Sequence, residues 1–164
     1  MLVVRNSLKL LEEFQIANET PNRVSSDHRD KVAWKPPPPG WFKVNMNGAL
    51  FSTAKQSDIG VMVRDEEGNV IAALSRKLDL PLGALEIEAK ALEAGIQFAE
   101  EVELRKVVFE SDLLLAINVI HGVEEAAASI QNIIHGVLRK VQGFETFDFL
   151  HTKRQGNVPA HLLA

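Results

Sequence analysis

The chain contains no cysteine, so neither a disulfide framework nor a metal site built on thiolates is available to it. It has no apolar run of the length that spans a bilayer, and the apolar residues 2–4 are followed at once by a charge, unlike a secretory signal. The net charge of −4 argues against strong non-specific binding to nucleic acid, although it leaves room for local basic patches. We therefore expect an intracellular protein without membrane contact.

The chain does have enough apolar residues for one core. With 46% hydrophobic residues among 164, it accommodates one domain and a short appendage. An apolar stripe of Leu8, Leu11 and Phe14 predicts a helix over residues 2–18. Residues 18–30 are polar and typical of a linker. We therefore predict a helix and linker over residues 1–33 and a domain over residues 34–164, with the prolines at 36–39 as a rigid spacer.

Hydrophobic periodicity divides the domain into strands and helices. Alternating residues predict strands over 41–50, 59–63 and 70–78, and the last two are joined by a turn that contains Gly68. Further strands are predicted at 106–110 and 146–150, helices at 84–101, 113–121 and 126–142, and a short last helix capped by Asn157. The order βββ-α-β-α-α-β-α predicts a mixed α/β (α+β) fold. Its five-stranded sheet has three antiparallel strands first and helices on both faces.

Two carboxylates are notable because neither belongs to a solvated face. Glu88 has apolar neighbours one turn away in its predicted helix, where an unpaired carboxylate is costly. Asp112 follows the strand at 106–110, and α/β folds tend to place ligand sites at such strand ends. Taken alone, Asp112 is better explained as the cap of the next helix, and Glu88 as an edge residue that reaches solvent. Together they predict a carboxylate site between a helix and a strand end.

Five segments of the chain resemble the ribonuclease H type 1 fold, and most closely its plant branch related to retrotransposon reverse transcriptases. The segments occur in the family's order, with fitting strands and helices between them, and the resemblance covers about residues 34–164. They are residues 41–49 (WFKVNMNGA), 59–65 (IGVMVRD), 86–92 (EIEAKAL), 110–112 (ESD) and the closing stretch 151–164.

The resemblance implies a nuclease that cleaves RNA–DNA hybrids with two Mg²⁺ or Mn²⁺ ions. In this family four acidic residues hold the ions; the matching positions are Asn47, Glu88, Asp112 and His161, of which only the middle two are acidic here. His151 matches a mobile histidine thought to help proton transfer or product release. The catalytic candidates are therefore Glu88, Asp112 and His151. With only two short helices between its fourth and fifth strands, the chain also lacks the basic helical protrusion by which some members grip the hybrid.

The two replaced carboxylates determine which chemistry can remain. Two Mg²⁺ ions about 4 Å apart clamp the attacking and leaving oxygens of a phosphodiester, and Mg²⁺ prefers carboxylate and water oxygens. Asn47 offers a neutral carbonyl, and His161 offers a nitrogen that suits softer metals such as Mn²⁺. In the family the first-strand carboxylate bridges both ions, so Asn47 is the more damaging change. We expect weak metal binding and reduced or lost hydrolysis.

Two further functions are compatible with the same resemblance. In one, the domain binds an RNA–DNA hybrid without cleaving it, through Lys43 and Asn45 on the first strand and Lys153 and Arg154 after the fifth. In the other, it is a structural fragment derived from a transposon, and its apolar stripes support protein contacts. Metal-dependent cleavage separates the enzyme from both, and salt-dependent hybrid binding separates these two. The sequence identifies no protein partner.

Overall fold

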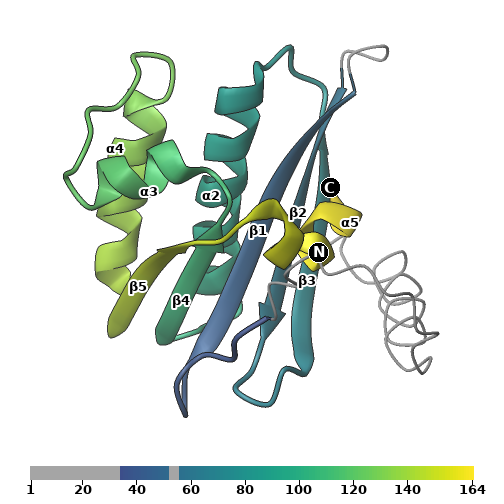
Figure 1. Ribbon diagram of the computed structural model, residues 1–164, viewed down its shortest axis with the longest axis vertical. Coiled ribbons are helices and arrows are strands. Elements are labelled where there is room, and N and C mark those ends of the chain that lie inside the picture. The colour runs from purple at the N-terminus through teal and green to yellow at the C-terminus, as the bar shows by residue number, and fades with distance from the viewer. Residues whose placement is uncertain (1–33, 52–55) are drawn as a thin grey trace, which may run out of the picture.

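The computed structural model describes residues 34–51 and 56–164. The helix and linker predicted for residues 1–33 lie outside the described residues. In the part of the chain that is described, one five-stranded sheet carries helices on both faces, as predicted (Figure 1). No helix within these ranges is long and apolar enough to cross a membrane.

The sheet has the strand order β3-β2-β1-β4-β5. Its first three strands form an antiparallel meander, whereas β4 runs parallel to β1 and β5 runs parallel to β4. Parallel neighbours need crossover connections, and the helices between these strands provide them. The mixed sheet predicted from the element order is thus confirmed. The strands are β1 (Phe42–Phe51), β2 (Gln56–Arg64), β3 (Val70–Leu78), β4 (Lys106–Ser111) and β5 (Thr146–His151).

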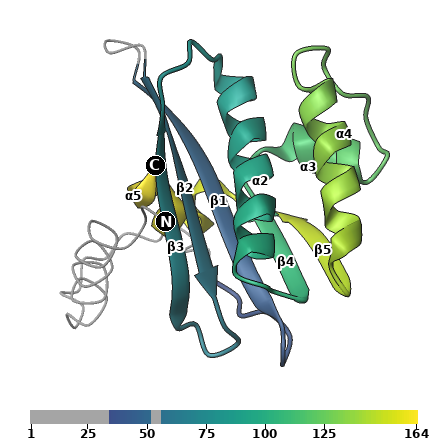
Figure 2. The ribbon, with the colours of Figure 1, turned by 180° about the vertical axis from the view of Figure 1, so that it is seen from behind.

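Three helices share an apolar core with one face of the sheet, and the short last helix packs on the other face (Figure 2). The long helix α2 follows its predicted bounds because its apolar stripe lies against β1 and β2. α5 reaches β2 closely, since Gly60 has no side chain to keep the backbone of Ala160 away. The helices are α2 (Ala84–Glu101), α3 (Leu114–Ile120), α4 (Gln131–Lys140) and α5 (Val158–Leu163).

α4 is shorter than the helix predicted for residues 126–142. It begins at Gln131, after a turn in which the Ile130 N–H donates to the carbonyl of Ala127 at 3.0 Å. Residues 126–129 are three alanines and a serine, and although Ala127 is partly buried against the core, they have little apolar area to bury. Helices in proteins depend on such packing more than on intrinsic propensity. The helix therefore starts where Ile130, which is fully buried, enters the core.

The segment before β1 packs on the sheet instead of standing apart as a spacer. The Trp34 ring lies over Arg64 at 4.2 Å and over Lys43 at 5.5 Å from the ring centroid, distances suited to cation–π attraction. The Lys43 ammonium also donates to the carbonyl of Lys35 at 2.6 Å. Pro37 is buried. The start of the domain is thus attached to the face opposite α2 before the first strand begins.

Candidate active site on the first strand

The candidate site forms where β1 and β4 separate. The two parallel strands stay paired up to Met46 and Ser111. Asn47 and Asp112 directly follow this last pair, so the strands place them side by side at the carboxyl end of β4, where α/β sheets hold ligands. Because Met46 faces the core with α2, the next residue, Asn47, faces the opposite side of the sheet.

Glu88 reaches the site because α2 approaches β1 closely at Gly48. A Cβ atom at Gly48 would lie 2.7 Å from the backbone oxygen of Ile87, so any other residue would require the helix to shift. The close approach lets the Gly48 N–H donate to Glu88 Oε2 at 3.0 Å. This glycine therefore sets the position of the carboxylate relative to the first strand.

Burial and a neighbouring carboxylate both oppose the ionisation of Glu88. Burial, together with the charge of Asp112, raises the pKa of Glu88 to about 7, and the Gly48 N–H and the Arg154 cation offset this only in part. Asp112 Oδ1 is buried and has no hydrogen-bond partner within the described part of the chain. Buried polar atoms are normally paired, so an unpaired carboxylate oxygen points to a cation, proton or ligand at this position.

Asp112 does not cap the following helix, which was the alternative explanation for it. The N-cap residue of α3 is Leu113, and no side chain bonds to the first turn of this helix. Ser111 Oγ instead accepts the Leu113 N–H at 3.2 Å. The carboxylate of Asp112 is thus available to the site beside Glu88.

His161 faces Asn47 from α5. Asn47 Nδ2 lies 3.1 Å from His161 Nδ1, and a guanidinium nitrogen of Arg154 lies 3.4 Å from His161 Nε2. Both ring nitrogens of His161 therefore contact side chains of the site, and the tautomer of the imidazole decides which of them accepts a hydrogen bond.

Asn157 supports the site in a way that the sequence did not reveal. It precedes α5 as predicted, but its side chain makes no capping bond to that helix. Its Nδ2 donates instead to the carbonyl of Met46 at 2.8 Å, and the residue is fully buried. This bond ties the start of α5 to the strand residue before Asn47, so His161, one turn later, is held against Asn47. The spacing of four residues between Asn157 and His161 was the available signal, since it places both on one helix face.

The carboxylates of the site do not balance the charge of two divalent ions. Two such ions carry four positive charges, whereas Glu88 and Asp112 are the only carboxylates among the four positions that match the family's site, and Asn47 and His161 add no negative charge. Among the residues that the structure describes, no three His, Asp or Glu side chains lie close enough together to hold a metal. The feature that suits a cation is the unpartnered oxygen of Asp112 beside Glu88.

Lys43 and Asn45 are buried, in contrast to the open binding face expected from the sequence. Lys43 is 3% exposed and pairs with Glu110 at 3.1 Å. Asn45 donates to the other Glu110 oxygen at 2.7 Å and accepts from Arg64 at 2.9 Å. Burial lowers the pKa of Arg64 to about 10, while the charge of Glu110 opposes that shift. These four side chains, here called the paired cluster, bind one another under Trp34 and are not presented to a phosphate backbone.

The basic loop after β5 does remain at the surface. Lys153, Arg154 and the strand-end residue His151 are all exposed, and His151 and Lys153 border a pocket of about 390 Å³. Arg154 also lies near enough to Glu88 for its charge to lower the pKa of that carboxyl. The loop thus brings positive charge to the edge of the carboxylate site, in a place where a phosphate backbone could meet it.

The sheet order, the crossover helices and the four positions around Asn47 together define a ribonuclease H-like α/β domain. A model of the reverse transcriptase-like family matches residues 45–164, and the chain belongs to this family. A search of curated proteins returned no match.

Solved structures of ribonucleases H share the fold at low sequence identity. RNase H1 from Halobacterium salinarum matches with a TM-score of 0.70 and 17% identity over 76% of this chain and 94% of its own. LC11-RNase H1, solved in complex with an RNA/DNA hybrid, matches with a TM-score of 0.67 and 17% identity over 74% and 92%. The foamy viral protease-reverse transcriptase, also with RNA/DNA hybrid, matches at 0.56 and 15% over 89% and 22%. At these identities the similarity establishes the fold.

Proposed function

We propose that the chain is a ribonuclease H-like domain that binds RNA–DNA hybrids and has little or no hydrolytic activity. The observation that carries this proposal is the 3.1 Å contact between Asn47 and His161. An amide and an imidazole contact each other where the resemblance to the family calls for metal-binding carboxylates. With Glu88 and Asp112 as the only anions, a second divalent ion would be repelled by the first.

Binding of one divalent ion, Mg²⁺ or Mn²⁺, is compatible with these residues. Glu88 and Asp112 would hold it, with the amide oxygen of Asn47 as a neutral ligand, and a bound ion supplies Lewis-acid stabilisation to a phosphate oxygen. Because the pKa of Glu88 is raised to about 7, this carboxyl would release a proton when the ion binds near neutral pH. Affinity should therefore be low and should rise with pH.

Hybrid binding is supported by the exposed cations beside the carboxylates. Lys153 and Arg154 lie in the loop that leads into α5, where a backbone that crosses Asn47 would pass. Two proteins that share the fold were solved with RNA/DNA hybrids. The buried paired cluster is no longer part of this proposed surface, so the contacts would be fewer than the sequence suggested.

A cleavage assay on an RNA–DNA hybrid, with Mg²⁺ and separately with Mn²⁺, tests the catalytic half of the proposal. We expect the native chain to be inactive or nearly so with both metals. Restoring both carboxylates with Asn47→Asp and His161→Asp should introduce cleavage. Strong metal-dependent cleavage by the native chain would overturn the proposal and favour an active nuclease.

Hybrid affinity measured by fluorescence anisotropy across a salt series tests the binding half. The double variant Lys153→Ala/Arg154→Ala should bind more weakly, and its salt slope should fall by about two because each phosphate contact contributes about one. Lys77→Ala, an exposed cation on β3, is the matched control and should bind as the native chain does. An equal loss of hybrid affinity in both variants, or no hybrid binding by the native chain, would contradict the proposed binding. It would favour the alternative in which the domain is a structural fragment that supports protein contacts.

A further inference from the structure

The strand β5 forms one border of the sheet. It pairs with β4 on one side only, and both views of the ribbon place it at the outer limit of the sheet (Figures 1 and 2). Asp148, Leu150 and His151 are exposed. The outer edge of such a strand presents backbone donors and acceptors, so it is a surface on which a further strand can pair.

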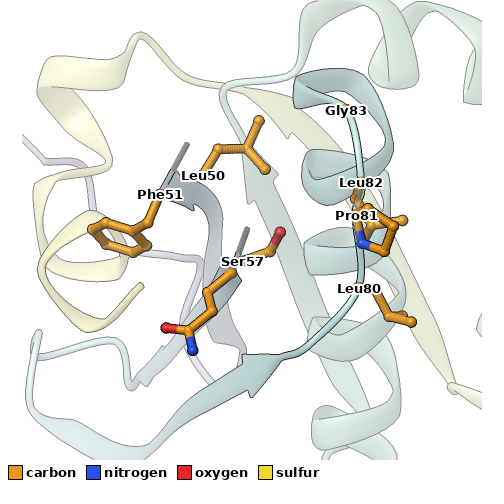
Figure 3. Close-up of a pocket in the computed structure, with 8 residues that line it drawn as sticks. Leu50, Phe51, Ser57, Leu80, Pro81, Leu82 and Gly83 are labelled. Carbon is orange, nitrogen blue, oxygen red and sulfur yellow. The ribbon is translucent and has the colours of Figure 1, made fainter. Parts of the chain in front are cut away.

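The residues around this edge are all described, in contrast to those around a pocket elsewhere on the domain. That pocket, of about 400 Å³, lies where β1 ends and β2 begins (Figure 3). Leu50 and Ser57 border one side of it, and residues 80–82 border the other. It adjoins residues 52–55, which lie outside the described residues. Residues 141–154, which comprise β5 and the connections on either side of it, are described throughout.

The hydrogen bonds to the β4 side determine which backbone groups of β5 face outward. The Thr146 N–H donates to the carbonyl of Arg105 at 3.2 Å. At the other end, the Thr152 N–H donates to the carbonyl of Ser111 at 2.9 Å. Successive residues of a strand point their N–H and C=O groups to alternate sides. The residues between these two bonds whose backbone groups point away from β4 are therefore Phe147, Phe149 and His151.

The side chain of Asp148 occupies the central one of these outward donors. Its Oδ1 accepts the Phe149 N–H at 2.8 Å. Hydrogen bonds to a charged acceptor are stronger than those to a neutral carbonyl. A strand that pairs with this edge must therefore displace the carboxylate before it can bond to Phe149.

The sequence of β5 indicates what this bond prevents. Residues 146–150 read TFDFL, in which a threonine and two phenylalanines favour strands and Asp148 supplies the only charge. Short segments that favour strands and carry little charge associate with one another when their edges are exposed, and a charge within the segment opposes this. Without Asp148, β5 would combine an exposed edge with an apolar, strand-forming sequence.

We propose that the outer edge of β5 is a pairing surface for a second copy of this chain and that Asp148 keeps it closed. The pairing that Asp148 opposes is antiparallel and two-fold symmetric, with Phe149 of one copy opposite Phe149 of the other. In this register the backbone groups of the two Phe149 residues bond each other, and Asp148 lies opposite the exposed Leu150. Pairing thus breaks both Asp148 bonds and places each carboxylate against a leucine.

Sedimentation equilibrium of the full chain, whose mass is 18.1 kDa, tests this proposal. Asp148→Thr removes the charge and the bond to Phe149, and threonine favours a strand. Its dimer dissociation constant should be at least about tenfold lower than that of the native chain, because two fewer hydrogen bonds are broken when a dimer forms. Asp148→Asn is the matched control. It keeps an oxygen that can accept the Phe149 N–H, so it should associate less strongly than Asp148→Thr.

Two second-site changes in the Asp148→Thr chain show whether association uses this edge. Leu150→Lys places a cation in the middle of the paired strands and should raise the dissociation constant to the native value or above it. Ile71→Lys should leave it unchanged. Ile71 is exposed to a similar extent, 46% against 41% for Leu150, but it lies on β3 at the other border of the sheet.

Amide hydrogen exchange identifies the paired strand independently. In the native chain the Phe149 amide should be protected, and the outward amides of Phe147 and His151 should exchange faster. In the Asp148→Thr dimer all three should be protected. The proposal would be overturned if Asp148→Thr associated no more strongly than the native chain, or if Ile71→Lys reversed its association and Leu150→Lys did not. Protection of all three amides in the native chain would equally overturn it.

Discussion

Two polar clusters lie two residues apart on β1, and they differ in how completely their charges are paired. In the paired cluster, Glu110 binds Lys43 and Asn45, and Asn45 also accepts from Arg64. Around Asn47, the carboxylate of Asp112 has an oxygen without a partner among the described residues, and the pKa of Glu88 is raised by burial and by the charge of Asp112. In both clusters the residues on β1, which are Lys43, Asn45 and Asn47, are buried.

The paired cluster joins three strands of the sheet. Its hydrogen bonds connect β1, β2 and β4, although Arg64 Nε is buried without a partner among the described residues. A cluster with an unpaired buried charge costs stability. Such clusters are common at functional sites, where a bound ligand pairs with the charge. The pairing of the carboxylates, and not the position of the residues on the strand, distinguishes the two clusters.

The largest effect should come from removing the central anion of the paired cluster. Glu110→Ala leaves the buried cations Lys43 and Arg64 without their partner, and breaking a buried ion pair in this way costs about 3–5 kcal/mol. Urea unfolding measures the loss. Glu125→Ala, an exposed glutamate after α3, should change the free energy of unfolding very little. A small loss in Glu110→Ala would mean that the cluster is not structural.

A comparable effect of opposite sign should follow when Glu88 is neutralised. Its pKa rises from 4.5 to about 7 on folding, so the folded state binds the proton more tightly. The stabilisation from this group is complete below about pH 4.5 and is lost as the pH rises through about 7, an effect of about 3 kcal/mol. Glu88→Gln should remove this dependence and be more stable than the native chain at pH 8.

Urea unfolding at pH 5 and pH 8 measures that difference. Glu100→Gln, an exposed position on the same helix, serves as the control and should keep the native dependence on pH. If native stability does not fall between these two pH values, burial and Asp112 do not raise the pKa of Glu88 as the structure indicates.

Restoring charge should turn the incomplete cluster into a better metal site, in a definite order. Asn47→Asp adds an anion where the family uses one to bridge both ions, and His161→Asp adds one at the periphery. Two ions in a small site repel each other, and only a bridging anion is near both. The gain in Mg²⁺ affinity from Asn47→Asp should therefore exceed the gain from His161→Asp by at least about tenfold. The double variant should exceed both in a calorimetric titration. Negligible Mg²⁺ binding by all three variants would mean that restoring the carboxylates is not enough to restore the metal site, and that only the fold of the nuclease family is retained.

The smallest effect should come from deleting residues 1–31. Trp34, which covers Lys43 and Arg64, is retained, so the paired cluster should stay closed. Cooperative unfolding should persist, with a change in the free energy of unfolding of about 1 kcal/mol or less, as expected when the core is left intact. Loss of a single cooperative transition would show that the deleted residues belong to the core and that the domain does not begin at residue 34.

Local sequence patterns predicted most of the helices and strands, but they did not predict where α4 starts or which group the side chain before α5 bonds. The bounds of β3 and α2 follow from alternation and from an apolar stripe, which are properties of neighbouring residues. The start of α4 was predicted several residues too early because alanines favour a helix locally, although their small side chains bury little area here. Asn157 was predicted as a cap, yet it bonds across to β1 because a buried carbonyl of Met46 lies there.

The sequence by itself determined the order of strands and helices, and it showed that Glu88 and Asp112 stand where a solvated carboxylate would not. These are consequences of period and spacing, which the chain carries locally. Only the tertiary structure decided that Lys43 and Asn45 are covered while Lys153 and Arg154 are exposed, because burial of a strand face depends on which distant segment covers it. It also decided that His161 bonds Asn47, since residues 114 positions apart meet only when α5 lies on β1.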